Sequence, residues 1–230
     1  MRNISLDLLT SAELRVTGRI IDASNASLLG EVAIDDEWVT VIYKPVVGER
    51  PLWDFPEGTL ANREVAAFAV SELLGLHIVP PTVLRDGPFG IGAVQLWSEQ
   101  DENFDLLSFA QSRDDRLRSM VIFDALVNNT DRKFGHILMD GEQLLGCDHG
   151  VTFHVEDKLR TVLWQFTGEE LTQNDLILLD SALGIDESQL RPLLSVEEIE
   201  AFYARAERLK SEGIYPEPSD DWPAVPWPPF

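Results

Sequence analysis

Two aspartates, Asp131 and Asp148, flank a predicted β-hairpin, and this order of groups suits phosphoryl transfer. In phosphotransferases one carboxylate orients or deprotonates the attacking hydroxyl, and a second carboxylate holds a divalent metal on the nucleotide phosphates. Lys133 follows the first aspartate closely, and His136 lies between the two aspartates. The segment therefore predicts a site that handles phosphate and metal.

A second pair of charged groups lies upstream, on a predicted strand and a predicted helix. Alternating apolar residues predict a strand over residues 38–44, which ends at Lys44. Apolar residues at helical spacing predict a helix over residues 60–74, and this helix carries Glu64. A strand lysine paired with a helix glutamate can hold the α- and β-phosphates of a nucleotide. Both pairs together predict a nucleotide-dependent phosphotransferase.

The two aspartates depend on a helix and a hairpin for their positions. Helical spacing over residues 114–128 predicts a helix that leads into the loop with Asp131. Residues 137–153 predict a hairpin, and its far arm carries Asp148. The hairpin would return the chain to the side of the first aspartate.

The remaining elements complete a fold with a β-rich first half and a helical second half. Strands are predicted over residues 14–21 and 28–34, and helices over residues 168–183 and 195–212. This order predicts an α+β fold of two lobes.

The change of character near residue 98 divides the chain. A predicted strand pair over 78–84 and 92–97 closes an N-lobe that covers residues 1–98, with the nucleotide-binding sheet and one helix. A C-lobe over 99–215 holds the catalytic loop and the metal-binding hairpin. Residues 216–230 form a tail rich in Pro and Trp, predicted to be extended and either packed on the body or free to bind a partner.

Charge and composition exclude several classes of protein. The 230 residues carry 18 Lys and Arg against 40 Asp and Glu, a net charge of −22, and such a surface repels nucleic acids and anionic membranes. No window approaches the roughly 18 apolar residues of a membrane span, and the N-terminus does not predict a secretion signal. The single cysteine, Cys147, allows no internal disulfide. We therefore expect a cytoplasmic protein with no nucleic-acid partner and no stable membrane insertion.

Several motifs resemble the phosphatidylinositol 3-/4-kinase-related branch of the protein-kinase-like superfamily, and in particular small actinobacterial proteins of that branch. The resemblance covers roughly residues 14–170. The Asn-Thr-Asp-Arg run is similar to the catalytic loop of type II phosphatidylinositol 4-kinases, and Asp-His-Gly stands where such kinases carry Asp-Phe-Gly. The motifs are Tyr43-Lys44-Pro45 and the segments 48–56, 63–67, 79–82, 129–133 and 148–150.

The resemblance implies a small bilobal kinase-like fold and a set of ATP-binding residues. Lys44 would bind the α/β-phosphates with Glu64 as its ion-pair partner. The loop over the phosphates and the segment beside the adenine would supply the others, which are Ser24, Asn25, Ser27, Gln95 and Trp97. The phosphate loop lacks the usual glycine-rich pattern, and Trp97 is alternatively a core residue.

The resemblance also implies catalytic and metal-binding residues. Asp131 would orient the acceptor hydroxyl and Lys133 would stabilise the transferring phosphoryl group, while Asp148 and His136 would hold Mn²⁺ or Mg²⁺. His136 stands where such kinases usually carry an asparagine, and it is alternatively a structural residue bonded to backbone. Because imidazole suits transition metals better than Mg²⁺, we predict that Mn²⁺ supports activity better than Mg²⁺.

The expected function is an ATP-dependent kinase that transfers the γ-phosphate to a hydroxyl. The strong negative charge favours a hydroxyl on protein, including autophosphorylation, over a lipid head group. Lys158 and Arg160 follow Asp148 and either attract an anionic substrate or form a solvated basic turn. Two alternatives remain, which are a nucleotide-binding pseudokinase scaffold and an AMP transferase on the same fold.

Overall fold

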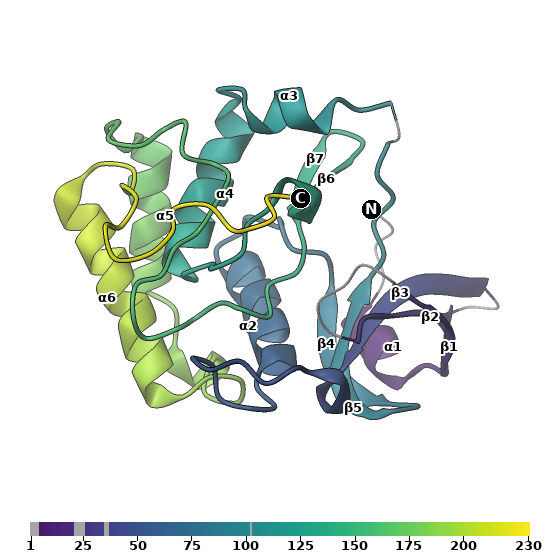
Figure 1. The fold of residues 1–230 in the computed structure, drawn as a ribbon. Helices are drawn as coiled ribbons and strands as arrows, with labels where there is room; N and C mark the ends of the chain where they lie inside the picture. Colours follow the sequence, from purple (N-terminus) through teal and green to yellow (C-terminus); the bar gives the residue numbers. More distant parts are fainter. Residues whose placement is uncertain (1–4, 21–25, 35–36, 102) are drawn as a thin grey trace.

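The computed structural model describes residues 5–20, 26–34, 37–101 and 103–230. Figure 1 shows a sheet on one side of the molecule and most of the helices on the other. The strands are β1 (Leu14–Arg19), β2 (Leu28–Ile34), β3 (Glu37–Pro45), β4 (Thr82–Gly87), β5 (Gly90–Leu96), β6 (Ile137–Asp140) and β7 (Gln143–Gly146). The α-helices are α1 (Leu6–Ser11), α2 (Leu60–Leu73), α3 (Leu106–Ala110), α4 (Asp115–Leu126), α5 (Gln173–Leu183) and α6 (Val196–Glu212).

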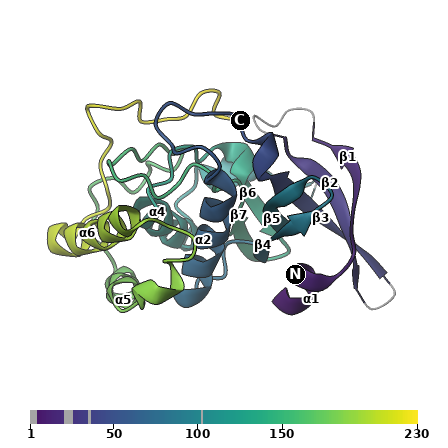
Figure 2. The ribbon, with the colours of Figure 1, turned by 90° about the horizontal axis from the view of Figure 1, so that it is seen from below.

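The five-stranded sheet is antiparallel and has the strand order β1-β2-β3-β5-β4. Side chains alternate between its faces, so Val41 and Tyr43 of β3 point toward α1 and pack with Leu9. Lys44 lies on the opposite face. In Figures 1 and 2, α2 lies between the sheet and the helical half of the chain. Glu64 of α2 faces Lys44, so this glutamate lies where the sheet meets the helical half of the chain.

The helical half is built on a second core, to which α2 also contributes, for example through Phe68. The inner face of α4 is apolar and fully buried, as at Met120 and Ile122, and it packs with Leu179 of α5 and Phe202 of α6. The hairpin β6–β7 follows α4, as predicted, and lies near α3 (Figure 1). It ends at Gly146 and not at residue 153, so Asp148 lies in the loop beyond the hairpin and not on its far arm. The α+β prediction is confirmed. Among the described residues, no helix is both long enough and apolar enough to span a bilayer.

Local polar groups and prolines moved several boundaries from their predicted positions. Helix α5 begins at Gln173 and not at residue 168, because Thr172 and Asp175 form a reciprocal capping box (Thr172 N to Asp175 Oδ2, 2.8 Å). Strand β4 begins at Thr82, after two prolines that cannot donate to a strand ladder. The short helices α1 and α3 were not predicted, since each has too few residues to show a period.

The tail over residues 216–230 packs on the body of the protein. The carbonyl of Ala224 accepts hydrogen bonds from Thr161 N (3.0 Å) and Trp164 Nε1 (2.9 Å). Farther along, Phe134 N donates to the carbonyl of Pro229 (2.9 Å), and the Phe134 and Phe230 rings lie 5.1 Å apart. The chain ends beside β6 (Figure 1).

We expect removal of residues 216–230 to lower the melting temperature by about 10 °C, since it breaks several hydrogen bonds of about 1 kcal/mol each together with the aromatic contacts. Calorimetry on the chain truncated after Tyr215 measures this. Trp227→Ala is the control, because that side chain is 89% exposed and its loss should leave the melting temperature nearly unchanged. An unchanged melting temperature in the truncated chain would contradict this packing energy.

Candidate active site

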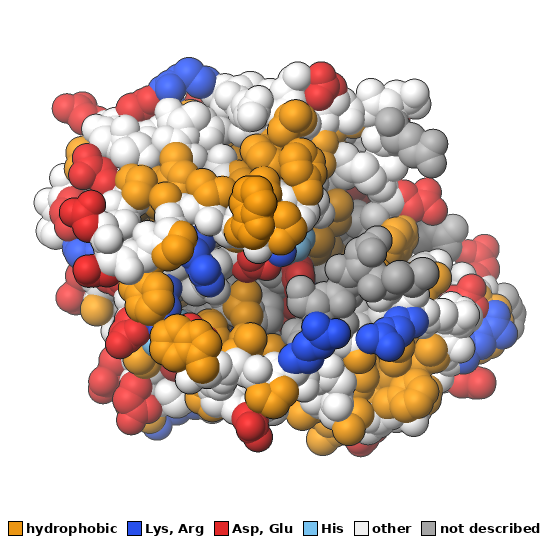
Figure 3. Space-filling model, in the orientation of Figure 1, with side chains coloured by type: hydrophobic (Ala, Val, Ile, Leu, Met, Phe, Trp, Pro, Cys, Tyr) orange, Lys and Arg blue, Asp and Glu red, His pale blue; other side chains and the backbone are white. Residues whose placement is uncertain are grey.

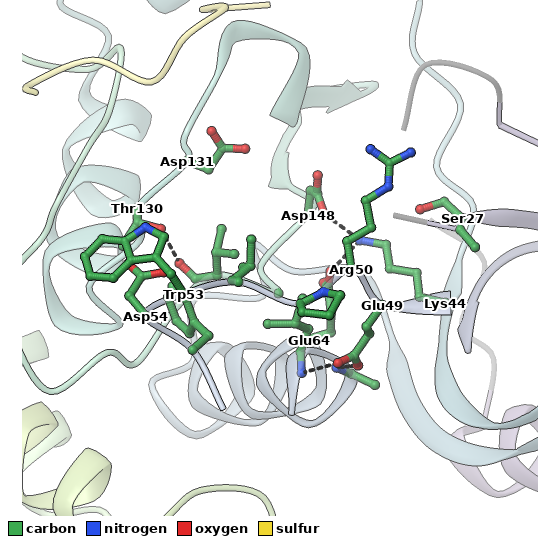
Figure 4. Close-up of a pocket in the computed structure, with 18 of the residues that line it drawn as sticks. Ser27, Lys44, Glu49, Arg50, Trp53, Asp54, Glu64, Thr130, Asp131 and Asp148 are labelled. Carbon is green, nitrogen blue, oxygen red and sulfur yellow. Dashed lines mark hydrogen bonds and ion pairs between the residues drawn. The ribbon is translucent and has the colours of Figure 1, made fainter. Parts of the chain in front are cut away.

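A lysine on β3 joins the sheet to the loop that carries the second aspartate. Lys44 Nζ pairs with Glu64 Oε1 from α2 and lies 2.8 Å from Asp148 Oδ1. The other oxygen of Glu64 accepts a hydrogen bond from His149 N (3.0 Å). Figure 4 shows Lys44 reaching across to Asp148 with Glu64 beneath it. Burial alone would lower the pKa of Lys44, but the two carboxylates outweigh burial and raise it, so the ammonium stays charged.

Helix α2 is anchored so that Glu64 faces this lysine. Thr59 precedes the helix, but its hydroxyl bonds to the carbonyl of Pro56 and does not cap the helix. The carboxylate of Glu49 caps it instead, accepting from Leu60 N (3.2 Å) and Ala61 N (2.9 Å). Because Glu49 lies 11 residues before Leu60, the pattern next to the helix gives no signal for this cap.

Asp148 lies in a left-handed backbone conformation (φ 60°), which aspartate adopts more readily than most residues. One carboxylate oxygen binds Lys44, and the other lies 3.4 Å from His136 Nε2. The nearby ammonium is the largest effect on the carboxyl group and lowers the pKa of Asp148, so the carboxylate stays ionised. An ionised oxygen therefore faces the imidazole.

The ring of His136 is fixed by the loop that carries the first aspartate. His136 Nδ1 lies 2.8 Å from the carbonyl oxygen of Asp131, so this nitrogen carries the proton and donates. Nε2 then presents a lone pair toward Asp148. Burial lowers the pKa of His136, which favours the neutral ring that can ligate a metal.

Asp131, His136 and Asp148 form a group with the spacing of metal ligands. One ligand atom from each lies within 4.8 Å of the others. The donor set has one imidazole nitrogen and two carboxylates, which fits a divalent ion of the Mn²⁺ type better than an all-oxygen ion such as Mg²⁺. The residues present therefore fit a metal.

Asp131 has a second neighbour that bears on its chemistry. Lys133 Nζ lies 3.3 Å from Asp131 Oδ2, and Asp131 N donates to Asn129 Oδ1 (3.0 Å). Burial is the largest effect on the carboxyl group and raises the pKa of Asp131. A more basic carboxylate is better suited to accept a proton.

A buried arginine beneath the carboxylates was not assigned a role from the sequence. The guanidinium of Arg132 binds both oxygens of Asp124 on α4 (2.8 Å each) and the carbonyl of His136 (2.9 Å). Its Nη2 also donates to His149 Nε2 (2.7 Å). The signal that could have found this cluster is Asp124 itself, a charged residue in the apolar face of a helix.

A cavity of about 500 Å³ opens in front of these groups. Lys44, Asp131 and Asp148 line one side, and Trp53 and Trp222 line the other. Figure 3 shows a hollow on this face with acidic side chains in its depth and hydrophobic side chains along its rim. Asp131 and Asp148 therefore line one cavity together with Lys44, whereas His136 and Lys133 lie behind them, in contact with Asp148 and Asp131 respectively.

The predicted nucleotide contacts are divided between regions. Ser27 lines the same cavity as Lys44, whereas Ser24 and Asn25 lie outside the described residues. Gln95 lines none of the cavities described; it is buried, and its amide donates to Thr82 Oγ1 (2.8 Å). Trp97 borders a second hollow of about 620 Å³ together with Trp38 and Thr40. Asp131 and Asp148 do not line this hollow.

Comparison with solved structures defines the class of fold. The chain is similar to the Golgi casein kinase with Mn/ADP bound (TM-score 0.61, 14% identity, 90% of this chain and 74% of that chain). It is similar to hydra Fam20 with sugar (TM-score 0.57, 15% identity, 90% and 86%). The Helicobacter pylori proinflammatory kinase CtkA gives a TM-score of 0.52 at 14% identity (90% and 94%). The chain therefore has a protein-kinase-like fold, as predicted.

The sequence comparison defines the family. The chain is 39% identical over 267 aligned residues to Protein Rv2133c of Mycobacterium tuberculosis, covering 97% of this chain and 94% of that protein. It belongs to the same family as Rv2133c. No family model matches the chain. Because the solved structures share so little sequence with it, they show the fold alone, and the narrower resemblance to phosphatidylinositol 3-/4-kinase-related proteins stays a prediction.

Proposed function

We propose that this protein is an ATP-dependent phosphotransferase that moves the γ-phosphate to a hydroxyl group. The observation that carries the proposal is that Lys44, Asp131 and Asp148 line one cavity, with His136 grouped beside the two aspartates. The protein-kinase-like fold supports it, and one similar structure was solved with Mn/ADP. The phosphatidylinositol 3-/4-kinase-related character belongs to the same proposal and rests on the motifs at 129–133 and 148–150.

Each residue has a chemical role in this proposal. Lys44 binds the α- and β-phosphates, and Asp131 orients the acceptor hydroxyl and takes its proton as the phosphoryl group is transferred. Lys133, beside Asp131, stabilises the charge on the transferring group. Asp148 and His136 would hold a divalent ion, which supplies neutralisation of the phosphate charge when bound. Lys44 keeps Asp148 ionised, as metal binding requires.

Incubation of the full chain with γ-labelled and α-labelled ATP tests the proposal. Transfer of the γ-label to a hydroxyl compound, or to the protein, supports a kinase. Transfer of the α-label would instead indicate an AMP transferase, and nucleotide binding without transfer of either label would indicate a pseudokinase scaffold. Either result would overturn the proposal. Intact mass after incubation with ATP and Mn²⁺ reports self-modification directly.

We expect Mn²⁺ to support a higher rate than Mg²⁺ at equal concentration, because His136 offers a nitrogen ligand. His136→Asn should reduce the ratio of the Mn²⁺ rate to the Mg²⁺ rate by about 10-fold. Changes to the residues around a metal commonly alter metal affinity by about 10- to 100-fold. His77→Asn is the control, because His77 is an exposed histidine paired with Glu72 on the surface. Equal rates with both metals in the unsubstituted chain would show that His136 is structural only.

A further inference from the structure

Arg160 is held beside Asp131 by backbone hydrogen bonds on both sides. Arg160 N donates to the carbonyl of Asn129 (3.0 Å), and the carbonyl of Arg160 accepts from Arg132 N (3.1 Å). The segment around Arg160 therefore runs along the loop that carries Asp131. Its side chain lines the same cavity as Asp131 and Thr130.

The guanidinium of Arg160 has no partner within the described part of the chain. Its Nε is buried and donates no hydrogen bond. The neighbouring cations are already paired, since Lys133 lies 3.3 Å from Asp131 Oδ2 and Lys158 Nζ lies 3.1 Å from Asp54 Oδ2. A buried donor without an acceptor is unusual in a native structure and needs an explanation. A bound anion would supply the missing acceptor, even in a chain of net charge −22.

The side of the cavity that faces Asp131 and Asp148 is already formed by contacts within the protein. The rings of Trp53 and Trp222 lie 6.3 Å apart, and Lys158 Nζ lies 4.8 Å and 4.4 Å from their centroids. These contacts join the loop after β3, the segment before Arg160 and the tail. The cavity volume of about 500 Å³ is that of a pocket for a small molecule.

We propose that the acceptor is a small hydroxyl compound that carries an anionic group, a phosphate or a carboxylate, and that Arg160 binds this group. The proposal rests on the proposed function, because it takes Asp131 as the group that meets the hydroxyl. It replaces the expectation from the sequence that the acceptor hydroxyl belongs to a protein. Of the two roles left open for Arg160, an anion-binding residue or part of a solvated basic turn, it chooses the first. An arginine offers a planar fork of donors that matches either anion.

The transfer step is balanced within the site. A bond forms between the acceptor oxygen and the γ-phosphorus, and the bond from that phosphorus to the β–γ bridging oxygen breaks. The electron pair leaves with ADP, and the proton of the hydroxyl passes to Asp131. Arg160 takes no part in these bonds and acts by fixing the acceptor.

The first test measures anion binding without catalysis. The full chain is saturated with a non-hydrolysable ATP analogue and Mn²⁺ and titrated with inorganic phosphate or acetate, with calorimetry and intrinsic tryptophan fluorescence as readouts. We expect Arg160→Gln to weaken binding of one of these anions by at least about 10-fold, since it removes a charge-assisted contact. The arm with the larger loss identifies the anionic group.

Arg191→Gln is the matched control, because it removes the same charge from an exposed surface pair with Glu187. Equal anion affinity in Arg160→Gln and the unsubstituted chain would overturn the proposal, as would an equal loss in Arg191→Gln. Arg160→Lys should restore part of the affinity if charge is required. Failure to bind the ATP analogue would count against the proposed function instead, and phosphate binding is then compared in the free chains.

The second test measures which acceptor is used. Glycerol and glycerol 3-phosphate differ by the anionic group, and γ-labelled ATP reports transfer to each. We expect kcat/KM to be at least about 10-fold higher for glycerol 3-phosphate, and we expect Arg160→Gln to abolish that preference. Preference for glycerol, or for a protein such as casein over both compounds, would overturn the proposal.

Discussion

Replacement of Asp131 by alanine is expected to lower the rate of phosphoryl transfer by about 10³-fold, within the range that positioned acid–base groups contribute. The reason is the placement of this carboxylate, which lies between Lys133 and the pair formed by His136 and Asp148. Burial raises its pKa and makes it a better proton acceptor. The rate is measured as transfer of γ-label from ATP.

Nucleotide binding separates this effect from a general loss of the site. Lys44 and Asp148 remain in Asp131→Ala and are paired with each other, so affinity for an ATP analogue should change little. Asp220→Ala is the matched control, because Asp220 is exposed on the tail and lines neither cavity described above. Full activity of Asp131→Ala would show that another group orients the acceptor.

The sequence alone predicted that Lys44, Glu64 and Asp148 belong to one site. Lys44 lies on a strand and Glu64 on a helix whose periods are visible in the chain, and Asp148 follows two residues after the hairpin. Their contacts in the structure follow from those elements. Their chemical roles stay predictions.

The part of the cavity that is lined by Asp54, Lys158 and Trp222 was not predictable in the same way. Asp54 and Lys158 form an ion pair although they lie 104 residues apart in the chain, and both lie in irregular segments without a period. Trp222 belongs to a tail for which the sequence left packing and partner binding equally open. Such contacts depend on how loops fold over a finished core, and a single sequence gives no local signal for them.

The buried polar cluster under the site shows why one residue can matter to both aspartates. Arg132 follows Asp131 directly and binds the carbonyls of His136 and Cys147, the residue before Asp148 (2.9 Å and 3.3 Å). Gly146 leaves room for it, since a side chain there would place its Cβ 2.9 Å from Arg132 Nη1. The guanidinium therefore ties the loop of the first aspartate to the loop of the second.

Arg132→Met is accordingly expected to lower the free energy of unfolding by about 3–5 kcal/mol, the usual effect of removing one partner of a buried ion pair. The side chain of Arg132 is 0% exposed and that of Asp124 is 1% exposed, so the carboxylate would be left buried without its cation. Urea denaturation of the full chain measures the change. Arg191→Met is the control and should cost about 0.2–1 kcal/mol, because it removes one partner of an exposed ion pair.

The double variant Asp124→Asn with Arg132→Met distinguishes loss of the ion pair from loss of packing. If the buried charge of Asp124 causes the instability, neutralising it should recover part of the loss, and the double variant should be more stable than the sum of the single effects predicts. Additive effects would instead assign the loss to the hydrogen bonds that Arg132 donates to His136 and His149. A change of less than about 1 kcal/mol in Arg132→Met would contradict the buried-pair account altogether, because the median exposed pair already contributes that little.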